Sequence, residues 1–220
     1  MANRRSLLIG SGAAFVAAAA GTGVSFVFGS SAALAQQFDA GRLLQPAGGV
    51  PDHPLGNKDS KVTVVEYLSP TCPHCKVFAE TVFPQIKAEY VDTDKIQWIP
   101  RPFTRNVLDA VVFMLAEAAG EAKYHEVIDT FFKTQDTWVT SNKPNDAMFA
   151  IAQQLGFTKE SYDAALTNQA LFSGLETLRD QATNEFKLQG TPTFYINGKM
   201  LTGEASFEAL KAEIDPLLAA

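Results

Sequence analysis

The only two cysteines of this 220-residue chain stand close together, in the motif Cys72-Pro73-His74-Cys75. The motif lies between an apolar, β-branched run over residues 62–68 and a segment over residues 76–90 whose apolar residues recur at helical spacing. Two intervening residues let both sulfur atoms project from one helical turn, close enough to form a disulfide. Free backbone N–H groups and the helix dipole stabilise a thiolate at a helix N-terminus, and the thiolate is the reactive form of cysteine. The motif therefore predicts a redox-active dithiol on a strand–helix unit.

A Cys-x-x-Cys pair is also half of many structural zinc sites, which need four ligands. The chain has no second cysteine pair, and its histidines, His53, His74 and His125, lack the spacing of a zinc motif. A zinc site would have to take ligands from another chain. Redox chemistry is therefore favoured, and no metal site is predicted.

Residues 1–35 have the features of an export signal. Arg4 and Arg5 precede an uncharged stretch over residues 6–37 that is rich in Ala, Leu, Val and Phe. Ala33-Leu34-Ala35 is a small-x-small site of the kind that a signal peptidase cuts. We expect cleavage near Ala35 and delivery to the periplasm, an oxidising compartment in which disulfides persist.

The route of export stays open at this stage. Residues 3–8 resemble an imperfect twin-arginine signal, and general secretion is the other route. Residues 7–28 are long enough to cross a membrane, so an uncleaved anchor is the alternative to a cleaved signal.

Charge and size limit what the processed chain can be. Removing the signal takes away two arginines, so the formal net charge falls from −6 to −8. No basic stripe is present, which argues against nucleic acid as a partner. With 46% apolar residues and about 185 residues left, one well-buried domain is expected, over residues 61–218.

The order of predicted elements indicates an α/β domain. Residues 36–60, rich in Gly, Pro and Asp, are predicted to be an N-terminal tail. Strands over residues 62–68 and 95–99 flank the helix that follows the cysteines, which favours a parallel pair, and Pro84 should kink or split that helix. Further helices are predicted within residues 106–188, over 107–119, 124–133, 147–155, 161–166 and 172–186.

The C-terminal part returns to strands and carries a second motif. Residues 193–196 are a predicted strand, Asn197-Gly198 a hairpin turn, and residues 207–217 a last helix. Before the strand stands Thr191-Pro192. A proline that enters a strand cannot donate to the ladder, so it belongs at an edge or a cis turn; an ordinary turn at the strand's start is the alternative.

Together these motifs resemble the DsbA-like branch of the thioredoxin superfamily. The match is carried by Glu66, the Cys72–Cys75 motif, Thr191-Pro192, residues 193–198 and the helical run between the two halves. It covers roughly residues 60–217. The resemblance implies a thioredoxin fold with an inserted all-helical subdomain, the insertion spanning about residues 106–188.

The resemblance also implies roles for individual residues. Cys72 would be the exposed nucleophile and Cys75 the shielded partner. Pro192 would be a cis-proline packed against the pair, and Thr191 would offer its backbone to an extended substrate peptide.

Three further residues would support this chemistry. Pro73 and His74 lie between the cysteines, and His74 should favour the Cys72 thiolate and so make the disulfide a stronger oxidant; a solvent-exposed spectator is the alternative. Glu66 would exchange protons with the buried cysteine, unless it points to solvent at a strand end, and Arg101 is a candidate charge partner for it.

The sequence thus predicts an exported thiol:disulfide oxidoreductase that acts mainly as an oxidase of reduced exported proteins. No organic cofactor is needed, because the dithiol is the redox centre. The resemblance implies reoxidation by a membrane-bound, quinone-linked thiol oxidase of the DsbB kind. A monomer is expected, because about 25 residues before the first strand are too few for a dimerisation domain.

Two other classes of function remain. A disulfide isomerase or reductase would be kept reduced by a different membrane partner. A non-enzymatic binder would be a thiol-dependent metal carrier or a peptide-holding chaperone. Copper carriers of this fold add a His or Met ligand near the cysteines, and here His74 is the one available, since Met114 and Met148 fall in the insertion.

Overall fold

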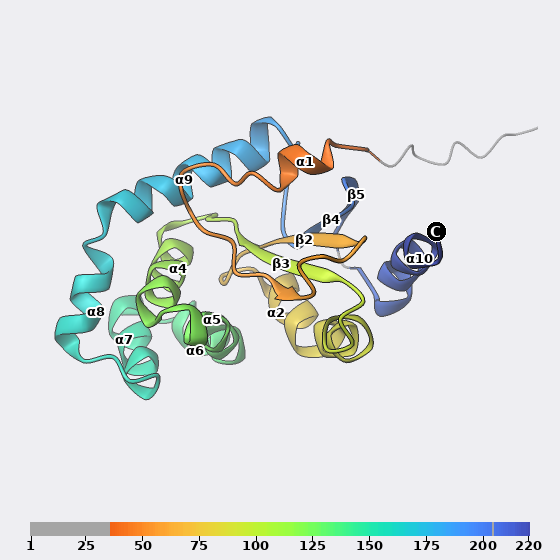
Figure 1. Ribbon diagram of the computed structural model, residues 1–220. Coiled ribbons are helices and arrows are strands. Elements are labelled where there is room, and N and C mark those ends of the chain that lie inside the picture. The colour runs from red at the N-terminus through yellow and green to blue at the C-terminus, as the bar shows by residue number, and fades with distance from the viewer. Residues whose placement is uncertain (1–35, 204) are drawn as a thin grey trace, which may run out of the picture. The chain divides into compact units, whose positions relative to one another are not determined.

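The computed structural model describes residues 36–203 and 205–220 (Figure 1). The predicted export signal, with its arginine pair and cleavage site in residues 1–35, lies outside the described residues. Across the described part of the chain, no helix has both the length and the apolar composition needed to cross a membrane. Over the same residues, no three His, Cys, Asp or Glu side chains lie together as a metal site would require.

A five-stranded sheet in the order β1-β3-β2-β4-β5 forms the centre of the described fold. β2 and β3 are parallel, as the strand–helix–strand pattern predicted, and the other neighbours are antiparallel. The Asn197-Gly198 turn joins β4 to β5, which confirms the predicted hairpin. The strands are β1 Leu55–Gly56, β2 Thr63–Leu68, β3 Gln97–Pro102, β4 Thr193–Ile196 and β5 Lys199–Thr202.

β3 lies further along the chain than the predicted strand over residues 95–99, because two prolines are tolerated in it. The N–H groups of Gln97 and Phe103 donate to β2, so those of the even-numbered residues between them face away from β2. On that side β1 pairs only with residues 97–98. Prolines at positions 100 and 102 therefore remove no ladder hydrogen bond to the described strands.

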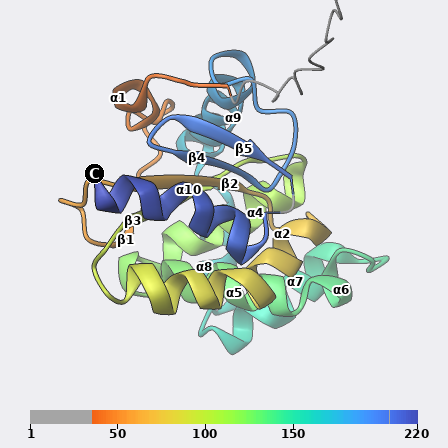
Figure 2. The same ribbon diagram turned by 90° about the vertical axis from the view of Figure 1, so that its right-hand side faces the viewer.

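The two faces of the sheet are covered by different helices (Figures 1 and 2). Side chains alternate between the faces, as strand geometry requires. Val64, Trp98 and Phe194 pack with the helical run after the cysteines and with α10 (Phe207–Ala219). Val65 and Tyr195 pack with α1 (Ala40–Leu43) and with the residues at the end of α9 (Gln169–Asn184).

The helical run after the cysteines is longer than the predicted one over residues 76–90. It consists of α2 Pro73–Val77, the π-helical segment η1 Phe78–Val82, α3 Phe83–Ile86 and the π-helical segment η2 Lys87–Val91. Pro84 falls in the first turn of α3, directly after η1. A proline there lacks an N–H that the first turn of an α-helix does not use, so the run continues past it.

The insertion is all-helical, as the resemblance implied, and lies to one side of the sheet (Figure 1). Helices over residues 107–119 and 124–133 form as predicted, whereas α6 was not predicted. Buried aromatic side chains such as Phe113, Phe131 and Trp138 form the insertion's core, which also includes the two cysteines. The elements are α4 Val107–Ala119, the 3₁₀ segment η3 Glu121–Lys123, α5 Tyr124–Lys133, α6 Gln135–Trp138, α7 Pro144–Gln154, α8 Lys159–Leu166 and α9.

Residues 36–60, predicted as a tail, lie along the domain in the structure. They form α1 and β1, and they bury Leu43 and Val50. Asp52 forms an ion pair with the buried Arg101 (Nε–Oδ1 2.8 Å). Elements of four and two residues are too short to show a periodic pattern, so they could not be predicted.

Candidate active site

The two cysteines lie where β2 passes into α2. Cys72 is the residue that caps the N-terminus of α2, and Pro73 is its first residue. A proline suits that position because the first N–H groups of a helix have no partner within it. Cys75 follows within the first turn, so both sulfur atoms lie at the positive end of the helix, as the motif predicted. Both cysteines are free thiols in this structure.

The surroundings of the two sulfur atoms differ in their effect on pKa. The pKa of Cys72 is lowered to about 5, mainly by a hydrogen bond from the Cys75 thiol; burial opposes this, and the Thr191 side chain and the backbone N–H groups of Cys75 and His74 add to it. The pKa of Cys75 is raised by burial and by the neighbouring Cys72. At neutral pH the pair is therefore a Cys72 thiolate beside a protonated Cys75.

The expectation of an exposed Cys72 was wrong: its exposed fraction is 3%, against 1% for Cys75. The loop that enters β4 lies against the sulfur, with Cys72 Sγ 3.2 Å from the Thr191 carbonyl oxygen. The Thr191–Pro192 peptide bond is cis, as expected from the resemblance. The structure thus brings together Cys72, Cys75, Thr191 and Pro192.

Pro73 and His74 are the exposed residues of the motif. The His74 backbone N–H contributes to the stabilisation of the Cys72 thiolate. This contribution depends on the position of His74 in the first turn of α2, which the sequence motif fixes.

Glu66 is a buried carboxyl on the sheet face that the cysteine helix covers. Its exposed fraction is 5%, which excludes the alternative of a side chain pointing to solvent. The Trp98 indole N–H donates to Glu66 Oε2 at 3.1 Å. The pKa of Glu66 is raised to about 8 by burial; the Trp98 bond opposes this, and the charge of Asp129 adds to it.

Arg101 is not the charge partner of Glu66. The register of β2 and β3 places Arg101 opposite Tyr67, whereas Glu66 lies opposite Pro100. Since neighbouring residues of a strand point to opposite faces, Arg101 and Glu66 are separated by the sheet. Arg101 instead binds Asp52.

Glu66 lines a cavity of about 360 Å³. Phe78 and Ala79 line it together with Glu66. These two residues follow Cys75 by three and four positions, about one turn further along the helical run. The wall that faces them comes from the insertion and includes His125 and Asp129.

Asp109, which sequence analysis did not single out, holds the loop before the cysteines. Its carboxylate accepts from Ser69 Oγ (2.9 Å), from the Thr71 N–H (2.7 Å) and from the Arg105 N–H (2.8 Å), and it is fully buried. Asp109 lies in the first turn of α4, where an acidic residue is common because of the helix dipole. That position concealed its contact with the active-site loop.

Gln135, also missed, holds the same loop from α6. Its Nε2 donates to the carbonyls of Pro70 (2.7 Å) and Cys72 (3.0 Å). The side chain is buried, so these bonds are shielded from water. No local signal marks a single glutamine in a four-residue helix. The insertion therefore positions the redox pair through one carboxylate and one amide.

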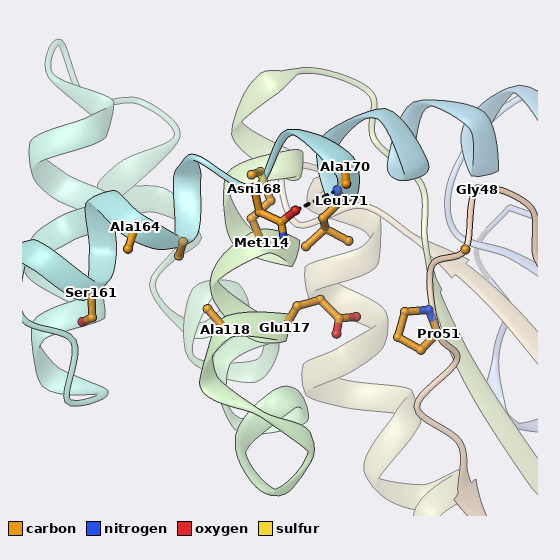
Figure 3. Close-up of a pocket in the computed structure, with 12 residues that line it drawn as sticks. Gly48, Pro51, Met114, Glu117, Ala118, Ser161, Ala164, Asn168, Ala170 and Leu171 are labelled. Atoms are coloured by element: carbon orange, nitrogen blue, oxygen red, sulfur yellow. Dashed lines mark hydrogen bonds between the residues drawn. The ribbon is translucent and has the colours of Figure 1, made fainter.

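A second cavity, of about 690 Å³, lies away from the cysteines (Figure 3). It is bordered by Gly48 and Pro51 of the N-terminal segment, by Glu117 of α4 and by residues of α8 and α9. Its one acidic residue, Glu117, is bonded to His53 at 2.9 Å. None of the predicted site residues lines this cavity, so it is not part of the redox site.

Comparisons with known sequences agree with this site. The sequence model of the thioredoxin family matches residues 49–216. A Rickettsia bellii protein named for protein-disulfide oxidoreductase activity is 38% identical over 168 residues, which are 74% of this chain and 63% of that protein. The chain thus spans less than two thirds of that relative's length. Disulfide bond formation protein D of Bacillus subtilis is 27% identical, over 73% of this chain and 74% of that protein.

Solved structures agree with the fold. A variant of alpha-DsbA1 from Wolbachia pipientis gives a TM-score of 0.74 at 25% identity, covering 83% of this chain and 96% of that one. Oxidised BdbD of Bacillus subtilis gives 0.65 at 25% identity, covering 80% and 97%. The chain belongs to the thioredoxin family and, within it, to the DsbA-like branch.

Proposed function

We propose that this protein is an exported thiol:disulfide oxidoreductase that acts mainly as an oxidase of reduced exported proteins. The observation that carries the proposal is the unequal pair of thiols: a Cys72 sulfur with a pKa of about 5 at a helix N-terminus, beside a buried Cys75 whose pKa is raised. The Cys72 sulfur is a good leaving group because its pKa is low, whereas the Cys75 sulfur stays protonated in the reduced protein.

The reaction begins with the Cys72–Cys75 disulfide. A substrate thiolate attacks the Cys72 sulfur; a substrate–Cys72 bond forms, and Cys75 leaves as a thiolate and takes up a proton. A second substrate thiolate then attacks the substrate sulfur of this mixed disulfide, and Cys72 leaves as a thiolate. The substrate gains a disulfide and loses two electrons, which the protein's dithiol then carries.

The low pKa of Cys72 supports the oxidase direction. At pH 7 a thiol with a pKa of about 5, against an ordinary 9.0, stabilises the reduced form by about 3 kcal/mol, or about 60 mV toward a stronger oxidant. The name of the Bacillus subtilis relative, a disulfide bond formation protein, also supports this direction.

Glu66 has the properties of a proton carrier for Cys75. A pKa of about 8 leaves the carboxyl protonated at neutral pH and able to release the proton with little cost. The leaving Cys75 thiolate needs a proton in a site that raises the thiol pKa. The cavity beside Glu66 supplies the path by which water restores that proton.

Substrate and partner proteins would meet the protein at the loop that enters β4. The Thr191 backbone lies against the Cys72 sulfur, so a peptide extended along it would bring its cysteine to the reacting atom. Reoxidation would pass the two electrons to a membrane-bound, quinone-linked thiol oxidase of the DsbB kind. The protein would work in the periplasm as a monomer that starts near Gln36 after loss of residues 1–35.

The reduction potential of the Cys72–Cys75 couple tests the proposal. Purified residues 36–220 are equilibrated with glutathione mixtures, and a Cys72→Ser variant serves as the control for non-specific thiol reaction. The expected result is a potential of roughly −120 mV, near the oxidising end of this superfamily. A potential near about −270 mV would overturn the oxidase direction and leave a reductase.

A further inference from the structure

The first described residues lie along the outer edge of β5 and make one isolated antiparallel bridge to it, between Gln37 and Lys199. The Met200 N–H donates to the Gln36 carbonyl (2.9 Å), and the Phe38 N–H donates to the Gly198 carbonyl (2.8 Å). β5 is the last strand of the sheet, so its outer edge would otherwise offer unpaired backbone groups. Residues 36–38 are called the edge segment below.

The edge segment is seated by side chains as well as by its backbone. Gln37 Nε2 donates to the Asn197 carbonyl at 3.0 Å. The Phe38 ring meets Tyr195 edge-on, with ring centroids 5.5 Å apart. A Cβ atom at Gly198 would stand 2.2 Å from the Phe38 carbonyl oxygen, so the hairpin turn leaves room for the segment only because glycine is there.

The edge segment borders the groove beside the redox site. A cavity of about 330 Å³ is lined by Gln36 together with Thr191 and Pro192. Its described lining residues include no carboxylate. Its polar lining consists mostly of amide and hydroxyl side chains, those of Gln36, Gln189, Thr191, Thr193 and Thr202. Among the lining residues that the structure describes, the one charged residue, Lys187, already donates from Nζ to the Asn184 carbonyl at 2.6 Å.

We propose that Gln36 is a specificity-determining residue of this groove and selects extended peptide segments with uncharged polar side chains next to the reacting cysteine. The inference rests on the proposed function, in which the peptide lies along Thr191. A side-chain amide offers both a donor and an acceptor, and that of Gln36 makes no hydrogen bond to any described residue. An apolar peptide would cover the Gln36 amide without giving it a partner, which disfavours such a peptide.

Two dithiol peptides that differ only beside their cysteines test the proposal. One carries Ser, Thr and Asn at those positions, and the other carries Leu and Val. Their oxidation is followed with the unchanged protein, with Gln36→Ala and with Gln153→Ala, an exposed glutamine of α7 that serves as the matched control. The readouts are KM and kcat for each peptide and the reduction potential of the Cys72–Cys75 couple.

Gln36→Ala is expected to raise KM for the polar peptide about three- to tenfold, the loss that one neutral hydrogen bond gives. For the apolar peptide KM should change less than about twofold, with kcat and the potential unchanged, and Gln153→Ala should change neither. Equal KM values in all three proteins would overturn the role of Gln36.

Failure of the proposed function would look different. The unchanged protein would then oxidise neither peptide, or its potential would lie at the reducing end. In that case the same peptides in their disulfide form are tested as substrates for reduction. If Gln36→Ala also leaves the preference for the polar peptide unchanged in this reduction assay, the role of Gln36 is wrong whichever direction the protein catalyses.

Discussion

Two buried carboxyls flank the active-site loop, and they differ in the number of donors that reach them. Asp109, on the side of the insertion, accepts from the Ser69 hydroxyl and from the N–H groups of Thr71 and Arg105. Glu66, on the side of the sheet, accepts from the Trp98 indole alone among the described donors. Both are almost fully buried.

The difference separates an anchor from the proposed proton carrier. Burial raises the pKa of both carboxyls, and each donor opposes that rise by favouring the charged form. At Asp109 three donors also fix the orientation of the carboxylate, and these hydrogen bonds hold the loop in place. At Glu66 one donor leaves a pKa of about 8, where protons exchange near neutral pH.

Asp109→Ala is expected to have the largest effect on stability. It removes the acceptor of two part-buried backbone N–H groups and leaves the buried Ser69 hydroxyl with only Thr71 Oγ1 at 3.3 Å, so the free energy of unfolding should fall by about 4 kcal/mol. Urea denaturation measures this. Asp136→Ala removes an exposed carboxylate that pairs with Lys76, and as the control it should cost less than about 1 kcal/mol. A loss at Asp109 as small as the control's would remove the distinction between anchor and carrier.

Glu66→Gln should change how stability depends on pH. The unfolded carboxyl, with a pKa of 4.5, releases its proton at lower pH than the folded one, with a pKa of about 8. Between these values the folded state holds more protons, so the Glu66 contribution to stability falls as pH rises, by about 3 to 4 kcal/mol from pH 5 to 8. The Gln variant should lack this fall.

The measurement needs a background without the two thiols. Cys72 has a lowered pKa in the folded protein, so its contribution rises over the same pH range and would mask that of Glu66. Unfolding is therefore followed from pH 5 to 9 in a Cys72→Ser, Cys75→Ser protein, with and without Glu66→Gln. Parallel pH profiles would show that Glu66 does not titrate in this range. In the protein with both cysteines, Glu66→Gln should also change the pH dependence of mixed-disulfide resolution.

The sequence contained the parts of this site that depend on local pattern. The cysteine motif, the Thr191-Pro192 turn and helix α4 follow from spacing, proline chemistry and periodicity, each of which acts over a few residues. The burial of Glu66 could not be predicted, because an acidic residue in an apolar strand is either buried with a partner or points to solvent, and the sequence does not decide between the two.

The contacts that hold the site could not be predicted, because they join residues far apart in the chain. Asp109 and Gln135 bind the loop across 38 to 65 positions, and neither residue departs from what its helix would contain anyway. The wrong partner for Arg101 has the same origin: the register of β2 and β3, which no periodicity reveals, decides which face it shares.

Trp98→Phe is expected to have the smallest of these effects, and it tests directly whether the number of donors sets the pKa of Glu66. Removing the indole N–H takes away the one hydrogen bond that stabilises the charged Glu66, so the Glu66 pKa should rise further, by about one unit, which is about 1.4 kcal/mol. Carbon NMR of the Glu66 carboxyl against pH measures this without depending on the packing that the smaller ring loses. Glu66→Gln in the same background identifies the signal. An unchanged or lower midpoint would mean that the donor count does not set the pKa of Glu66, and the contrast with Asp109 would then have to rest on burial alone.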